Sequence, residues 1–314
     1  MEMYHLRYFV AVAQELSFTR AAGQLHLATS PLSQRIKDLE RELGSALFVR
    51  AHHKITLTPA GETLLPLATE VISRFDRLPD LVRDVVSGTA RRARIGIAPD
   101  VPPVLRDDFI RSLARDHPGI MPQLVPGSTE PLRRKVLAGQ IDIALVHGPV
   151  VDRSLRVQRL STQSAGVAVA RGAGFDHRQS VRLSELAHLP YVSIDPETAP
   201  EVYRRAHQVL TRAGVHGRVV IDGDNLAGLA HLVAAGQAFA FVGMESGATR
   251  KVFAGEPVLI LPVADANLRV STEVIWQTGR AEDDDIVADL ITVATSLRRA
   301  VRPVPPAAAG SPSA

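Results

Sequence analysis

Cysteine is absent from the 314-residue sequence, which excludes disulfide bonds, a thiolate nucleophile and any zinc site built on cysteine. Aromatic residues make up only 4% of the chain, so aliphatic side chains and alanine must dominate the core. No run of about 18 apolar residues occurs, so no transmembrane helix is expected. The N-terminal stretch MEMYHLRYFV lacks the charged start and apolar run of a signal peptide. These absences are typical of a cytoplasmic protein.

Sequence motifs of common enzyme classes are also absent. The chain has no GxSxG elbow, no GxxxxGK[ST] phosphate loop, no GxGxxG after a strand and no HExxH metal motif. Serine, histidine and aspartate occur, but no spacing marks a catalytic triad. His52 and His53 lack a third ligand at a suitable spacing. We therefore expect no enzymatic activity, no bound metal and no cofactor.

The overall composition is that of a globular protein with a sizeable core. Hydrophobic residues account for 46% of the chain and charged residues for 22%. The length suggests two or three domains. The net charge of +3 is only a weak sign of nucleic-acid binding, so any such binding must depend on where the charges lie.

A short amphipathic helix is predicted between Ser30 and Gly44. Ser30 can cap it, Pro31 suits its first position, and Gly44 suits a left-handed stop. An apolar stripe follows helical spacing and consists of Leu32, Ile36, Leu39 and Leu43. The opposite side is polar and then basic, and consists of Ser30, Ser33, Gln34, Lys37 and Arg41.

A second helix is predicted to precede it, beginning after Ser17. Ala21 and Ala22 are small enough to allow close packing, and residues 26–29 form a short connection. Two helices joined in this way indicate a helix-turn-helix, whose second helix places its N-terminal side chains against base edges in the major groove. The alternative is an ordinary pair of amphipathic helices with a solvated face.

Two β-prone runs follow, at residues 47–49 and 55–57, and they predict a hairpin with a basic tip. Arg50 and Lys54 lie beside this tip. Such a wing can neutralise phosphates or enter a minor groove.

A long helix is predicted from Pro59, with Thr58 as its cap. Steps of four and three form an apolar seam of Leu64, Ala68, Val71, Phe75, Leu78, Val82 and Val85. We expect this seam to pair with a second copy of the chain, although packing against the chain's own body is the alternative. Pro66 and Pro79 predict a bend or a break. Residues 87–93 read as a polar hinge.

From residue 93 onward, strand-like and helical stretches alternate, which indicates two α/β lobes that enclose a cleft. Small ligands bind beyond the carboxyl ends of strands in such sheets. Turn and helix-start residues after strands are therefore candidate ligand contacts, although each could be only a cap or a turn. They are Pro99, Asp100, Ser128, Thr129, His147, Asp195, Pro196 and Asn225.

The segments LRYFVAVAQELSFTRAAGQLHLATSPLSQRIKDLERELGSALFVR and ITLTPAG resemble the N-terminal winged helix-turn-helix of LysR-type transcriptional regulators. VLAGQIDIALV and LVAAGQAFAFVG resemble the effector domain of that family, which is similar to type II periplasmic binding proteins. The family often has glutamine where Thr29 stands here. The resemblance implies DNA contacts by Thr29, Ser30, Ser33, Gln34, Lys37, Arg50 and Lys54.

The resemblance also implies an α/β fold with a mainly α N-terminal domain, a linker helix and a two-lobed effector domain. We expect a winged helix-turn-helix in 1–58, a linker in 59–92, an effector domain in 93–302 and a disordered tail in 303–314. Lobe I would comprise 93–158 and 266–302, and lobe II 159–265. The expected function is transcriptional regulation on double-stranded promoter DNA, controlled by a small-molecule effector, in a homodimer or a dimer of dimers. The alternative is a small-solute-binding protein without a DNA function.

Overall fold

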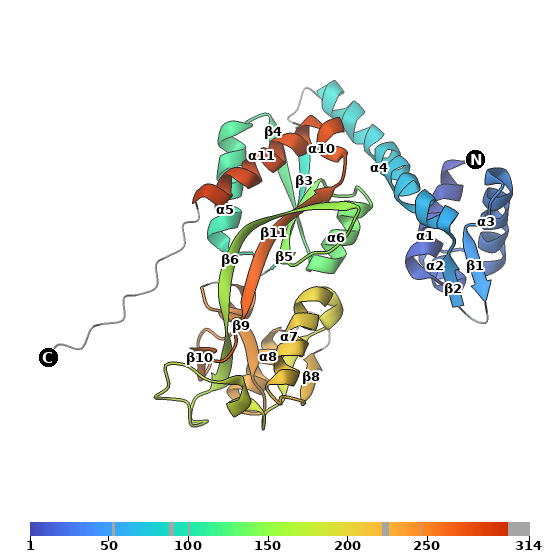
Figure 1. Cartoon of the computed structure of the whole chain (residues 1–314). Helices are drawn as coiled ribbons and strands as arrows, with labels where there is room; N and C mark the ends of the chain where they lie inside the picture. Colours follow the sequence, from blue (N-terminus) through green and yellow to red (C-terminus); the bar gives the residue numbers. More distant parts are fainter. Residues whose placement is uncertain (52–53, 88–90, 100, 222–225, 246, 301–314) are drawn as a thin grey trace.

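The computed structural model describes residues 1–51, 54–87, 91–99, 101–221, 226–245 and 247–300. An N-terminal domain is joined by the long helix α4 to a larger two-lobed body (Figure 1). The predicted tail at 303–314 lies outside the described residues.

The N-terminal domain contains three helices and a hairpin. They are α1 (Met3–Glu15), α2 (Phe18–Gln24), α3 (Thr29–Leu43), β1 (Phe48–Ala51) and β2 (Lys54–Leu57). The two helices after Ser17 and the hairpin follow the predicted order, whereas the first helix was not predicted. Ser17 caps α2, because its hydroxyl accepts a hydrogen bond from the Arg20 amide at 3.3 Å. Gly44 ends α3 with a φ of 66°, as its left-handed role requires.

The start of α3 differs from the prediction. The N-cap is Ala28, whose side chain cannot accept a hydrogen bond, and Ser30 already lies inside the first turn. Helix α3 therefore begins earlier than expected, with Thr29 and Ser30 exposed on its first turn. Leu32, Ile36 and Leu39 are fully buried in the domain core, as their spacing predicts.

Helix α4 (Pro59–Ser87) is capped as expected by Thr58, whose hydroxyl accepts from the Gly61 amide at 3.1 Å. The predicted break is wrong, because Pro66 and Pro79 both lie inside one helix of 29 residues. Each proline removes a single backbone hydrogen bond. The other bonds of the helix, and its packing against α1, maintain the helix.

Thr58 also ties the start of α4 to the preceding turn, because its hydroxyl donates to the Ala46 carbonyl at 2.6 Å. Replacing Thr58 with alanine should lower the free energy of unfolding by about 1 kcal/mol, since an N-cap and a turn contact are both lost. Thr63→Ala is the matched control, because the Thr63 hydroxyl, in the described part of the chain, donates to the Pro59 carbonyl of its own helix. Denaturant titration of both variants checks this, and equal stabilities would contradict it.

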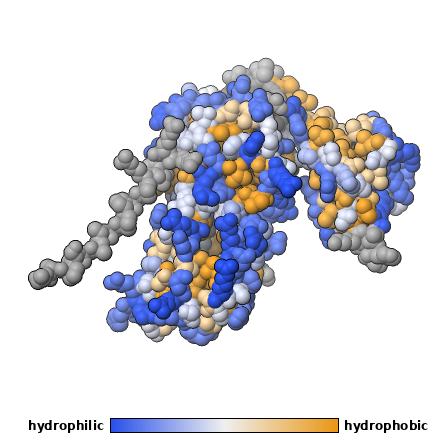
Figure 2. Space-filling view, viewed as in Figure 1, coloured by the Kyte–Doolittle hydropathy of each residue, from blue (hydrophilic) through white to orange (hydrophobic). Residues whose placement is uncertain are grey.

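The predicted apolar seam of α4 is partly buried in the N-terminal domain and partly exposed. Leu64 and Ala68, which we expected in the pairing seam, instead pack into the core of the N-terminal domain. Four other members of the predicted seam, Val71, Phe75, Leu78 and Val82, are exposed, and together with Leu67 they form an exposed apolar stripe. Figure 2 shows hydrophobic residues along this helix, between the N-terminal domain and the two-lobed body. The side chain of Val85 lies outside the described part of the chain.

One sheet runs through both lobes, with strand order β10-β6-β11-β5-β3-β4 and β9 paired to β6. In lobe I its strands are β3 (Arg91–Ile97), β4 (Ile120–Pro126) and β5 (Ile143–Gly148). The strands β6 (Leu155–Ala170) and β11 (Arg269–Gln277) pair antiparallel and cross between the lobes. Because β3 begins at Arg91, the last residues of the predicted polar hinge belong to the sheet instead.

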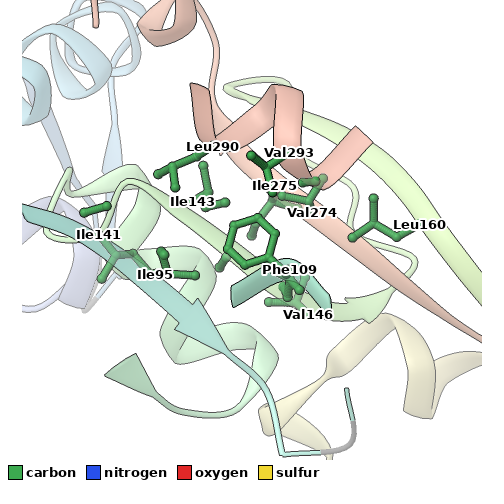
Figure 3. Close-up of a cluster of buried hydrophobic side chains, with 14 of the residues drawn as sticks. Ile95, Phe109, Ile141, Ile143, Val146, Leu160, Val274, Ile275, Leu290 and Val293 are labelled. Atoms are coloured by element: carbon green, nitrogen blue, oxygen red, sulfur yellow. The ribbon is translucent and has the colours of Figure 1, made fainter. Parts of the chain in front are cut away.

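Helices cover lobe I on both sides of the sheet. They are α5 (Pro103–Asp116), α6 (Thr129–Leu137), α10 (Arg280–Asp283) and α11 (Asp285–Ala300). Helix α11 packs against α5, whereas α6 packs against β5 and β11. Phe109 of α5, Ile143 of β5 and Leu290 of α11 meet in the fully buried core (Figure 3). This core fixes the ends of β5 and α6.

Two apolar cores hold lobe II together. Its elements are η1 (Leu183–Leu186), β7 (Tyr191–Ile194), η2 (Pro196–Thr198), α7 (Pro200–Arg212), β8 (Arg218–Ile221), α8 (Leu226–Ala234), β9 (Ala240–Gly243), α9 (Ala248–Val252) and β10 (Val258–Pro262). Strands β7 and β8 pair in parallel. Helix α7 lies on the side of lobe II that faces α6 (Figure 1).

Candidate functional site

The outer face of α3 carries the polar residues predicted to contact DNA. Thr29, Ser30, Gln34 and Lys37 are exposed, and Ser33 is half-buried. This exposure follows from the helical period, because burial of the aliphatic stripe turns these side chains outward. The face thus offers hydroxyl and amide groups at its N-terminal end and a positive charge one turn later.

Arg50 of the wing is held by the N-terminal domain itself. Its guanidinium donates to the Ser33 hydroxyl at 3.3 Å, lies 3.6 Å from the Glu40 carboxylate and stacks over the Phe18 ring at 4.7 Å. Arg50 therefore fixes Ser33 as well as presenting charge. Lys54 begins β2, but its side chain lies outside the described residues, as do His52 and His53.

A cavity of about 660 Å³ lies between the two lobes. Lobe I contributes the residues at the ends of β3 and β5 and the start of α6, while lobe II contributes β7, α7 and β9. Residues of the crossing strands β6 and β11 form the wall between them. The volume falls in the range of small-molecule sites, which is about 300–1,000 Å³.

The structure brings four of the predicted ligand residues together at this cavity. They are Pro99, Ser128, Thr129 and His147. Ser128 is the N-cap of α6, and the Thr129 hydroxyl accepts a hydrogen bond from the His147 amide at 3.1 Å. That bond joins the start of α6 to the end of β5, so these polar groups are held in fixed positions.

Asp195 and Pro196, which were also predicted as ligand residues, do not line the cavity. Pro196 starts η2, and the Asp195 carboxylate accepts from the Glu197 amide at 2.9 Å as the cap of that turn. Asp195 and Pro196 therefore serve as a cap and a turn, which is the alternative that the sequence analysis left open. Asp100 and Asn225 lie outside the described residues.

Sequence reasoning missed the lobe II wall of the cavity. Tyr191 and Phe241 line it, with their ring centroids 5.0 Å apart, and α7 lines it along most of its length. Burial raises the pKa of Tyr191. The guanidinium of Arg218 lies 5.6 Å from the Tyr191 ring, and burial lowers the pKa of Arg218. The sequence does show aromatic residues in short apolar strands and a helical period in α7. Neither pattern reveals which side chains face the cavity.

A buried carboxylate supports the cavity from behind. Glu273 on β11 is only 3% exposed, and its oxygens accept from the Val150 amide at 3.0 Å and the Ser271 hydroxyl at 3.1 Å. It thereby holds the turn after β5, where Gly148 and Pro149 line the cavity. Glu273 lies where the pairing of β11 with β6 shifts its register, at the crossing between the lobes.

Among the helices that the structure describes, none combines the length and apolar character needed to cross a membrane.

Comparison with known proteins matches both parts of the chain to models of one family. Residues 3–62 match the bacterial regulatory helix-turn-helix protein model of the lysR family. Residues 87–294 match the LysR substrate binding domain. The second match alone covers more than half of the chain.

Several curated regulators are similar over much of their length. The chain is 27% identical to the HTH-type transcriptional regulator AlsR of Bacillus subtilis, over 77% of this chain and 80% of that protein. It is 32% identical to the Hca operon transcriptional activator HcaR of Escherichia coli, over 62% of this chain and 66% of that protein.

The fold is shared with solved structures. The LysR family transcriptional regulator CbnR covers 95% of this chain and 99% of its own length, with a TM-score of 0.54 and 19% identity. A full-length OxyR variant from Pseudomonas aeruginosa gives a TM-score of 0.54 and 21% identity, over 95% of each chain. The winged N-terminal domain, the cavity between two α/β lobes and the two model matches agree: the chain belongs to the LysR family and is a DNA-binding transcriptional regulator with an effector-binding domain.

Proposed function

We propose that the protein reads a promoter through the exposed face of α3 and adjusts its binding when a small molecule occupies the cavity between the lobes. The observation that carries this proposal is the division of α3 between a buried aliphatic stripe and an exposed polar face. Hydroxyl and amide groups at the start of such a helix suit base edges in a major groove.

The proposed DNA contacts fall into two classes. Thr29, Ser30, Ser33 and Gln34 lie on the first two turns of α3 and would reach base edges, whereas Lys37 lies one turn further on. The wing residues Arg50 and Lys54 would contact phosphates or the minor groove, which positions the domain without reading sequence. Because Arg50 bonds to Ser33, contacts of the wing would also order the reading helix.

Binding of the full-length protein to its own upstream region, measured by electrophoretic shift at moderate salt, tests the function. We expect a shift that a scrambled duplex of equal length does not compete away. Equal competition by the scrambled duplex would reject sequence-specific binding and favour a solute-binding protein without a DNA function.

Gln34→Ala should weaken binding to the specific site by about 1–2 kcal/mol, roughly five- to thirtyfold, because one good base contact is lost. Binding to scrambled DNA should change little. Gln24→Ala, which removes an exposed glutamine at the end of α2, is the matched control. A competition assay with both duplexes measures the ratio, and an equal loss on both would show that Gln34 reads no sequence.

The effector would act by favouring one angle between the lobes. The cavity is built from both lobes, so a bound molecule contacts both and changes the relative stability of open and closed arrangements. We propose contacts by Pro99, Ser128, Thr129 and His147 on the lobe I side. Since promoter DNA is the partner, the proposed place of action is the cytoplasm and the proposed role is not enzymatic.

A second copy of the chain is the proposed partner of α4. Its exposed stripe of Leu67, Val71, Phe75, Leu78 and Val82 advances by steps of three and four, as in a two-helix seam. Two DNA-binding domains joined through α4 could read two half-sites. The seam thus links self-association to the length of DNA that is bound.

A further inference from the structure

Helix α7 lines the cavity with two different stripes of side chains. Val202, Ala206 and Val209, spaced by four and three, form an apolar stripe. Arg205, Gln208 and Arg212, spaced by three and four, form a polar stripe beside it. One helix therefore offers the same ligand an apolar surface and two positive charges.

Arg205 and Arg212 form no hydrogen bond or ion pair with an acidic side chain of the described residues, although the charge of Arg205 acts on Glu201. Arg204, on the same helix, donates to the Glu201 carboxylate at 3.0 Å. The hydrogen bond from Arg204 and, more weakly, the charges of Arg204 and Arg205 lower the pKa of Glu201. Glu201 is thus already engaged, whereas Arg205 and Arg212 form no ion pair with the described chain. Both side chains are exposed, so they lie at the mouth of the cavity.

The charged side chains among the described lining residues of the cavity are all basic. None of its described lining residues is an aspartate or a glutamate, and Arg269 adds a third arginine from the crossing strand β11. Arg218 lies behind the Tyr191 ring and bonds to His207 at 2.9 Å, so it contributes further positive charge without a described carboxylate. Cations that have no carboxylate among the described lining residues, placed around a concave surface, attract anions.

The inner wall is apolar and suits an uncharged body. Tyr191, Phe241 and Leu229 face the cavity from lobe II, opposite the polar start of α6. A second charge carried into this wall would lose its hydration without gaining an ion-pair partner, which is costly. A ligand with one charge at the mouth and an apolar body inside meets both demands.

We propose that the effector is a small organic monoanion, a carboxylate with an aromatic or branched apolar body. Its body lies between the apolar stripe of α7 and the wall formed by Tyr191 and Phe241. Its carboxylate pairs with Arg205 and Arg212. This inference rests on the proposed function of the cavity as the effector site, and adds the ligand class and the residues that select it.

The proposed ligand class is tested on the full-length protein with small molecules that separate the effect of charge from the effect of shape. Phenylacetate and 4-methylvalerate carry both features, their primary amides lack the charge, and inorganic phosphate lacks the body. We expect the carboxylates, at millimolar concentration, to raise the midpoint of thermal unfolding by about 2–4 °C. The amides should bind at least tenfold more weakly by calorimetry, and phosphate should have no effect.

Substitutions on α7 test the assigned residues. Arg212→Gln should weaken carboxylate binding by roughly three- to tenfold, and Arg205→Gln with Arg212→Gln by more than tenfold. Binding of the amides should stay unchanged. Arg204→Gln removes the same charge from the same helix but does not line the cavity, so it should alter carboxylate binding less than twofold. Higher salt should weaken carboxylate binding alone, because the arginines are exposed.

The outcomes distinguish the ligand class from the proposed function. The proposal of a monoanion would be overturned by any of three results. They are amides that bind as tightly as their carboxylates, a preference for phosphate, and no response to either carboxylate. Equal effects of Arg204→Gln and Arg212→Gln would overturn the residue assignment. Each can occur while the protein still shifts its own upstream DNA, whereas loss of that shift would reject the proposed function independently of the ligand.

Discussion

Phe75→Glu on α4 is expected to convert the protein from a self-associated form to a single chain of 33.9 kDa. Phe75 is 50% exposed at the middle of the apolar stripe, with Val71 one turn before it and Leu78 one turn after. Burying a phenylalanine stabilises an interface by about 1.5–3 kcal/mol, and a symmetric pair of helices buries it twice. An unpaired carboxylate there adds a desolvation penalty. The dissociation constant should therefore rise at least about a hundredfold.

Light scattering coupled to size-exclusion chromatography measures the mass directly. Arg74→Gln is the matched control. It lowers the net charge of the chain by one, as Phe75→Glu does, at the residue just before Phe75, whose side chain is exposed and polar. It should leave the mass unchanged. A Phe75→Glu variant with the wild-type mass would show that the α4 stripe is not the contact between copies.

The Phe75→Glu variant should also lose affinity for a promoter with two half-sites. The two DNA-binding domains would no longer be tethered, so the gain in effective concentration disappears. Binding to a single half-site should remain, because Phe75 lies outside the core of the N-terminal domain. A chain that binds neither duplex would have lost its DNA-binding domain instead.

The seam on α4 shows what helical period can and cannot predict. The steps of four and three locate a long amphipathic helix correctly, but they leave its rotation open, because α4 has apolar residues on more than one side. Ala68 is fully buried in the N-terminal core while Leu67, its neighbour, is 54% exposed. The core is completed by α1, which approaches from far away in the sequence, and no local pattern records that contact.

The ligand cavity likewise has a part that the sequence predicts and a part that it does not. Ser128 and Thr129 could be predicted because a cap at the start of a helix after a strand is a local signal. The contribution of α7 could not, because its stripe meets the cavity only through the packing of lobe II. Asp195 gave the same local signal as Ser128, yet among the described residues its carboxylate caps the turn of η2 and does not line the cavity. Local chemistry identifies candidates, and tertiary packing decides which of them face the ligand.

Gly148→Ala should lower the free energy of unfolding by about 3–4 kcal/mol, although it adds only one methyl group. A Cβ at this position would overlap the Glu273 carboxylate and the Ser271 hydroxyl. Glu273 cannot swing into solvent, because it is 3% exposed and holds the Val150 amide. Its displacement would leave a buried charge without its hydrogen bonds. Thermal unfolding, followed by the fluorescence of the lone tryptophan Trp276 on β11, should shift down by roughly 5–10 °C.

Gly119→Ala supplies the control, because a Cβ there would meet no atom within 4 Å. A double-mutant cycle then separates the clash from the loss of glycine itself. Glu273→Ala alone should destabilise lobe I by removing the anchor of the turn after β5. In the Glu273→Ala background Gly148→Ala should cost less, because the overlapping carboxylate is gone and the Ser271 hydroxyl, which bonded to it, is released to turn away from the new methyl group. Additive losses would show that the two residues act independently. Strong coupling would instead mean that the turn lining the cavity is set by Glu273, at the strand crossing that joins the two lobes.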